Sequence, residues 1–179
     1  MVCLNKQLCN ALLIGLLSWM PLSVIAQDLS ASSLCPVKEF QSKEGEVRVW
    51  QQQFEDSVFD LVMAPVIHDG SPPVIRLSFA GSKESKCHFP EVSVLKGGDW
   101  GWHVAWASTA KQAVYFVRVD GDAWVSSLPK KITPRLAEQV LLSEKSGQLI
   151  LSYQLLNQSK LQVLISDDEG RNFIISDEN

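Results

Sequence analysis

The sequence predicts an all-β fold in which antiparallel hairpin units form a propeller-like or sandwich arrangement. Apolar and polar residues alternate along most of the chain, a period of two that is typical of strands burying one face. Val, Ile, Phe, Tyr and Trp dominate these runs, and Gly, Asp, Asn, Ser and Pro separate them. The strands are predicted at Val47–Trp50, Val58–Ile67, Val74–Phe79, Val92–Leu95, His103–Ala107, Val114–Val119, Leu149–Tyr153 and Leu161–Ile165.

One segment leaves room for at most one short helix. Pro134–Leu142 follows Thr133, a residue type that caps helix N-termini, and it has Pro at the first position, where a helix tolerates it. The same segment is equally compatible with an extended strand, so both interpretations remain open.

The predicted strands also repeat as a unit of strand, loop, strand, a turn rich in Gly or Asp, and an aromatic residue. The three units run over residues 74–100, 103–124 and 149–173. One such unit cannot bury its apolar face alone, which favours a solenoid, a sandwich or propeller blades. The alternative is that any succession of hairpins looks repetitive.

The N-terminus, residues 1–26, has the features of a cleavable signal peptide. Lys6 is its only charge, Ala11–Leu17 is apolar, and small residues lead to a cleavage site after Ala26. A transmembrane anchor would need about 20 apolar residues, and this stretch is interrupted by Ser18, Pro21 and Ser23.

We therefore expect a periplasmic or secreted protein with no stable membrane insertion after signal cleavage. Residues 27–33 are small and polar and are predicted to form a disordered leader. Residues 34–179 are predicted to form a single β-domain of Asp/Gly-turn hairpin units, a length that suits one hydrophobic core.

Two cysteines, Cys35 and Cys87, remain after signal cleavage. Two thiols in an oxidising compartment usually pair. A disulfide between them would be worth on the order of 4 kcal/mol by the entropy of loop closure. The alternative is a reactive or metal-binding pair, suggested by the adjacent His88, but no further Cys or close His completes such a site.

Composition and motifs exclude several function classes. The net charge is −4 without a concentrated basic stretch, which argues against nucleic acid or an anionic bilayer as partner. The histidines are scattered, and the Asp pairs at 120/122 and 167/168 fit turns better than calcium loops. No phosphate loop or nucleophile elbow is present. We expect no catalytic residues, no metal and no cofactor, although a site of dispersed residues would escape this reasoning.

The turn at Ser166–Phe173 is the most specific motif. Its pattern Ser166-x-Asp168-x-Gly170-x-Asn172-Phe173 resembles the Asp-box of the sialidase-like β-propeller family, which has Thr or Ser where this chain has Asn172. The Asp can accept hydrogen bonds from its own turn, and Gly can adopt a positive φ. The resemblance implies propeller hairpins. It does not imply catalysis, because Asp-boxes in that family lie away from the catalytic face.

A tryptophan cluster provides the candidate binding site: Trp100, Trp102 and Trp106, with Trp124 nearby. The i, i+2 spacing of Trp100 and Trp102 places both indoles on one face of an extended segment. Two such rings suit a sugar or a protein hot spot. The alternative is that these residues belong to the core.

These observations lead to two functional hypotheses. The first is an exported non-catalytic binding domain that acts on a protein partner in the periplasm, as an inhibitor, an immunity protein or an envelope-assembly factor. The second is a carbohydrate-binding or glycoside-acting protein of the sialidase-like type.

Overall fold

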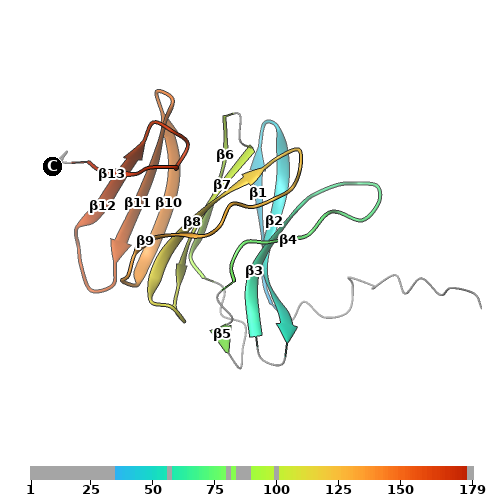
Figure 1. Ribbon diagram of the computed structural model, residues 1–179, viewed down its shortest axis with the longest axis horizontal. Coiled ribbons are helices and arrows are strands. Elements are labelled where there is room, and N and C mark those ends of the chain that lie inside the picture. Colours follow the sequence, from blue (N-terminus) through green and yellow to red (C-terminus); the bar gives the residue numbers. More distant parts are fainter. Residues whose placement is uncertain (1–34, 56–57, 80–81, 84–89, 99–100, 177–179) are drawn as a thin grey trace, which may run out of the picture. The chain divides into compact units, whose positions relative to one another are not determined.

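A computed structural model describes residues 35–55, 58–79, 82–83, 90–98 and 101–176. They belong to one compact unit, Ser33–Asn179. Every regular element in these residues is a β-strand, which confirms the predicted all-β fold class (Figure 1). The predicted signal peptide and leader, together with Cys87, His88 and Trp100, lie outside the described residues, so the predictions about them stay untested.

The strands form three antiparallel sheets in chain order. The first sheet has the order β1 (Val37–Ser42), β2 (Gly45–Glu55), β3 (Val58–Pro65) and β4 (Ile75–Arg76), with β5 (Ser82–Lys83) also pairing with β3. The second has β6 (Val92–Gly97), β7 (Gly101–Ser108), β8 (Ala113–Asp120) and β9 (Lys130–Thr133). The third has β10 (Ala137–Lys145), β11 (Gln148–Leu155), β12 (Leu161–Ser166) and β13 (Ile174–Ile175).

The second sheet lies between the other two, as Figure 1 shows. One core cluster joins it to the first sheet through residues such as Val49, Met63 and Val104, and another joins it to the third through Phe116 and Leu151. All of β7 is buried because both of its faces are covered. Face-to-face stacking of antiparallel sheets is consistent with the propeller-like or sandwich arrangement expected from the sequence.

The segment that could have been a helix forms a strand. β10 pairs with β11 from Ala137↔Leu155 to Lys145↔Gln148, with a register shift between Ala137 and Gln139. Val140 and Leu142 then point into the core with the strand period of two. From Ala137 onward β11 supplies hydrogen bonds to the segment, and this tertiary pairing outweighs the local helix signals at Thr133 and Pro134, while Pro134 and Arg135 form a bend before the strand.

The first predicted repeat unit, residues 74–100, is wrong. Val74–Phe79 contributes β4 to the first sheet, whereas Val92–Leu95 belongs to β6 of the second sheet, so the two do not form a hairpin. In the first sheet, the hairpin of β2 and β3 corresponds to the units at residues 103–124 and 149–173. In each sheet, a turn or loop then leads from the third strand to the fourth.

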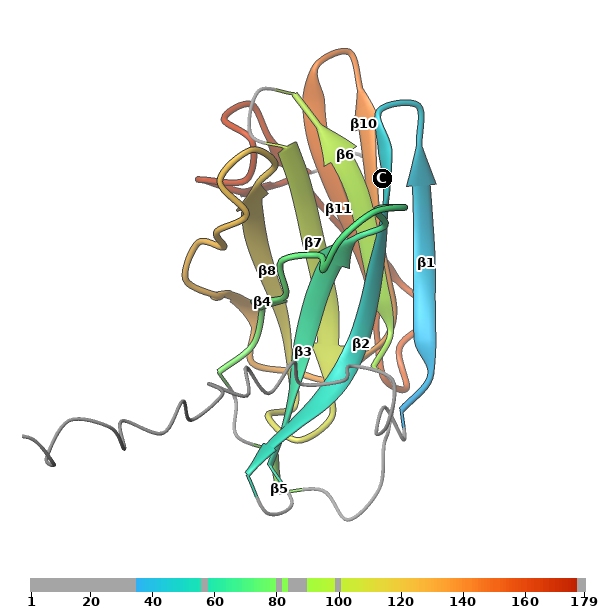
Figure 2. The same cartoon turned by 90° about the vertical axis from the view of Figure 1, so that its right-hand side faces the viewer.

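The loop between β8 and β9 reaches back to the first sheet. Ser126 Oγ donates a hydrogen bond of 3.1 Å to the carbonyl oxygen of Arg76 in β4. Figure 2 shows the first sheet facing the viewer, with this loop beside β4. The loop therefore brings residues of the second sheet next to the outer strand of the first.

Within the part of the chain that the structure describes, no helix has the length and apolar character needed to cross a membrane.

Candidate functional site

A polar network occupies the face of the first sheet that points away from the second. Leu61 and Met63 of β3 contact the second sheet, so the alternate residue Asp60 faces the other way. Arg76 of β4 lies opposite Val62 and shares the side of Asp60. The network is thus fixed by strand register.

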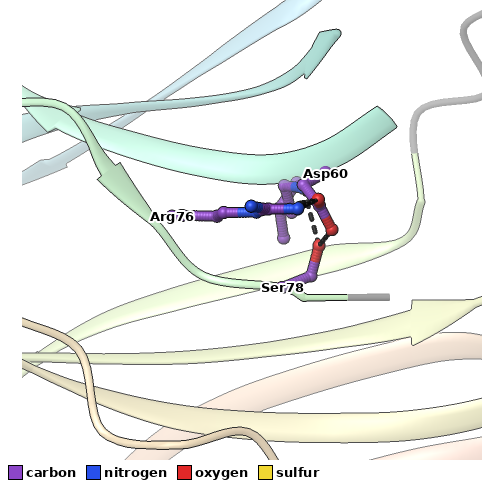
Figure 3. A network of polar contacts seen from close by, with 4 residues as sticks. Asp60, Arg76 and Ser78 are labelled. Atoms are coloured by element: carbon purple, nitrogen blue, oxygen red, sulfur yellow. Dashed lines mark hydrogen bonds and ion pairs between the residues drawn. The ribbon is translucent and has the colours of Figure 1, made fainter. Parts of the chain in front are cut away.

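Asp60 accepts hydrogen bonds from two side chains (Figure 3). Arg76 donates from Nε over 2.8 Å and also from Nη2 to Oδ2, and Ser78 Oγ donates to Oδ1 over 2.7 Å. The backbone amide of Leu61 donates to Ser78 Oγ over 2.8 Å. The carboxylate is fully buried while the Arg76 side chain is 35% exposed. The buried charge is therefore balanced by a cation that still reaches solvent.

Two phenylalanines flank the Arg76 guanidinium. Its Cζ lies 4.4 Å from the ring centroid of Phe54 and 5.2 Å from that of Phe79, distances typical of cation–π contacts. Phe54 is 43% exposed and Phe79 58% exposed. We call Phe54, Arg76 and Phe79 the Arg76 surface. It presents two aromatic rings and one positive charge, held in place from below by Asp60.

A pocket of about 200 Å³ adjoins this surface. Its described lining residues are Ser78, Phe79, Trp106, Lys111, Tyr115 and Pro129, and we call it the Lys111 pocket. The Trp106 and Tyr115 rings stack with centroids 5.5 Å apart and planes inclined by 22°. Since Phe79 belongs to both features, and Ser78 of the pocket donates a hydrogen bond to Asp60 beneath Arg76, the pocket and the Arg76 surface form one continuous site.

The structure places the predicted tryptophan site largely in the core. Trp102 is 4% exposed and Trp106 3% exposed, and both belong to the cluster between the first and second sheets. Trp124 packs partly buried against the same cluster. The core interpretation left open by the sequence fits these two tryptophans, and Trp106 alone of them reaches the wall of the Lys111 pocket.

The turn at Ser166–Phe173 is closed by its own side chains. Asp168 Oδ1 accepts hydrogen bonds from the Asn172 amide and from Ser166 Oγ, both over 2.7 Å, and the Asn172 side-chain amide donates to Oδ2 over 2.7 Å. Ser166 Oγ also accepts from the Gly170 amide over 2.8 Å. The backbone hydrogen bond from Asn172, followed by that from Ser166, lowers the pKa of Asp168 to about 2.

This turn attaches the third sheet to the second. The Phe173 ring meets the Phe116 ring edge-on with centroids 5.1 Å apart. The five predicted turn residues therefore work together in hairpin folding and sheet packing, away from the Arg76 surface.

His103 is buried at the same junction, stacked on Phe116 with ring centroids 5.8 Å apart. Burial, and then the positive charge of Arg118, lower the pKa of His103 to about 4. His68 is exposed. Among the described residues, no group of three His, Cys, Asp or Glu side chains is close enough to hold a metal ion.

Sequence reasoning missed the Arg76 surface. Neither Arg76 nor Asp60 is among the site residues predicted from the sequence. The signal is present in the sequence, because Asp60 is the one charged residue of Val58–Ile67 and Arg76 is the one charged residue of Val74–Phe79. The two charges are opposite. The pairing of β3 with β4, which brings Asp60 and Arg76 together, could not be predicted from the sequence.

No protein-family model matches the chain, and no curated protein is similar to it in sequence.

Proposed function

We propose that this chain is an exported, non-catalytic binding domain that docks a protein partner through the Arg76 surface. The periplasm or the extracellular space is the proposed location, and inhibition, immunity or envelope assembly is the proposed class of role. The observation that carries the proposal is an arginine held between two exposed phenylalanines above a buried carboxylate.

The composition of this surface supports a protein partner. Arginine and aromatic residues are enriched among the hot spots of protein interfaces. Asp60 and Ser78 fix the Arg76 side chain before any partner arrives, which lowers the entropy lost on binding. Exposed apolar residues continue the surface along the neighbouring β8–β9 loop, where Leu128 is 84% exposed.

The same network argues against Ser78 as a nucleophile. A reactive hydroxyl donates its hydrogen bond to a base that can take the proton. Ser78 donates to Asp60, whose charge is already matched by Arg76. Its Oγ also accepts from the Leu61 amide, so the hydroxyl serves to hold the loop after β4.

The second candidate is carbohydrate binding or glycoside turnover of the sialidase-like type. The stacked Trp106 and Tyr115 rings beside Lys111 favour it, together with the Asp-box resemblance of the turn at Ser166–Phe173. The deep burial of Trp106 speaks against it, because sugar rings stack on open aromatic faces.

The test is capture of a partner from an envelope extract by wild type and two variants. Phe79→Ser removes one wall of the Arg76 surface. Leu141→Ser is the matched control, because Leu141 is 59% exposed on β10 of the third sheet. We expect one stoichiometric protein with wild type and Leu141→Ser, and its loss with Phe79→Ser. Equal capture by all three, or a response on a glycan array or glycoside panel without protein capture, contradicts the proposal.

A further inference from the structure

The size of the Lys111 pocket limits what it can hold. An apolar cavity of about 150 Å³ accommodates a benzene molecule, and this pocket has a volume of about 200 Å³. Pockets for larger ligands have volumes of roughly 300–1,000 Å³. The Lys111 pocket therefore suits one compact ring or branched side chain, and an oligosaccharide would not fit.

The walls of the pocket are mainly apolar, with one positive charge. Phe79, Trp106, Tyr115 and Pro129 supply ring surfaces, and among the described lining residues Lys111 is the charged one. The Lys111 backbone is held by a 3.2 Å hydrogen bond from its amide to Ser108 Oγ, which fixes where the side chain starts.

The Lys111 ammonium makes no ion pair with another residue in the described ranges of the chain. Lys111 lines the pocket and is exposed. A positive charge beside an apolar pocket is complementary to an anion attached to an apolar body. A neutral apolar group would contact the walls of the pocket but would leave the Lys111 ammonium without a negatively charged partner.

We infer that the Lys111 pocket binds the C-terminal residue of the protein partner, with an apolar side chain in the pocket and the chain-terminal carboxylate on Lys111. This inference rests on the proposed function, since the pocket shares Ser78 and Phe79 with the neighbourhood of Arg76. A free aromatic carboxylate has the same chemistry, so the experiment includes one.

The experiment follows the Trp106 indole N–H resonance by NMR during titration with three probes. These are the tripeptide glycyl-glycyl-phenylalanine, its C-terminal amide, and 3-phenylpropionate. We expect saturable shifts with the tripeptide, with a Kd on the order of 1 mM for a ligand of this size. The amide lacks the negative charge and should bind at least about tenfold more weakly than the acid, the loss expected for one charge-assisted hydrogen bond.

Two variants make the role of the charge measurable. Lys111→Gln should weaken tripeptide binding roughly tenfold, the loss expected for one charge-assisted hydrogen bond. Lys145→Gln is the matched control, because Lys145 is exposed at the end of β10 in the third sheet, and it should bind as wild type. Unchanged spectra of both variants without probe establish that they are folded.

Three results overturn the inference: equal binding of the amide and the acid, binding of 3-phenylpropionate without the tripeptide, or equal loss in the two lysine variants. The proposed function fails separately, when Phe79→Ser still captures the partner. If partner capture is lost in Phe79→Ser but retained in Lys111→Gln, the proposed function is supported. The inference that the pocket binds the C-terminal residue of the partner is then wrong.

Discussion

Gly170 lies so close to Phe116 that a Cβ at position 170 would stand 2.3 Å from the Phe116 ring atoms Cε1 and Cζ. The turn at Ser166–Phe173 packs directly against Phe116 of the second sheet. This close packing explains why position 170 is a glycine, which has no side chain. The same residue has a φ of +84°, which glycine adopts without strain.

Gly170→Ala should lower the free energy of unfolding by about 3 kcal/mol, since overpacking adds about 1–3 kcal/mol to the backbone strain of about 1 kcal/mol. Gly147→Ala is the control: its φ is +79°, but nothing lies within 4 Å of the added Cβ. In this variant the free energy of unfolding should fall only by the cost of the backbone strain, about 1 kcal/mol. Urea denaturation of the two variants measures the difference, and equal losses would show that the Phe116 contact costs nothing.

Removing the buried carboxylate under Arg76 should destabilise the first sheet. Asp60→Asn leaves Arg76 without its counter-charge and should cost about 2 kcal/mol, moderated because Arg76 reaches solvent. Glu39→Gln is the control, because it breaks the exposed 2.8 Å pair with Arg48 and should cost less than about 0.5 kcal/mol. Urea midpoints compare the two, and a similar effect of both variants would mean that the buried network is no stronger than a surface pair.

The hydrogen bonds to Asp168 should make stability fall at acid pH. Its folded pKa of about 2 lies below the usual 3.8. A depressed carboxyl pKa stabilises the fold above the unfolded value and loses that effect as pH falls through the folded one. Wild type should therefore exceed Asp168→Asn in urea resistance at pH 5, and the gap should narrow between about pH 4 and pH 2. A gap that is constant over this window would show that the charge of Asp168 makes no contribution.

His103 should titrate far below an ordinary histidine. Its folded pKa is about 4 against the usual 6.5, because burial disfavours the imidazolium. The neutral ring is preferred in the fold, so this group's stabilising contribution is complete above pH 6.5 and is lost as pH falls towards 4. An NMR titration of the His103 ring protons should show little change down to about pH 5. A His103 midpoint near 6.5 would contradict its buried placement.

The fold class followed from the sequence because strand alternation is a local property. The strands β2, β6, β7, β8, β11 and β12 each contain a predicted run, and β3 and β4 each lie within one, since their apolar residues face a core. Of the unpredicted strands, β1, β9 and β13 lie at sheet edges, as does β10, which is equally compatible with a strand or a helix from its sequence. β1 and β9 carry many exposed polar residues, as edge strands commonly do, so little apolar alternation marks them.

The site was harder to predict because it depends on contacts between distant segments. Spacing alone could put tryptophans on one face of a strand, but it could not reveal that the first sheet covers the face carrying Trp102 and Trp106. Likewise, Asp60 and Arg76 meet only because β3 and β4 pair in the register Val62↔Arg76. The turn at Ser166–Phe173 was found readily, since all of its hydrogen bonds are local.

The most direct test of partner docking is photo-crosslinking in cells that export the protein, with a photoreactive phenylalanine analogue introduced at Phe79 or at Leu141. The account predicts one crosslinked protein adduct from position 79 and none from position 141. Absence of an adduct at position 79, or the same adduct from both positions, would contradict it.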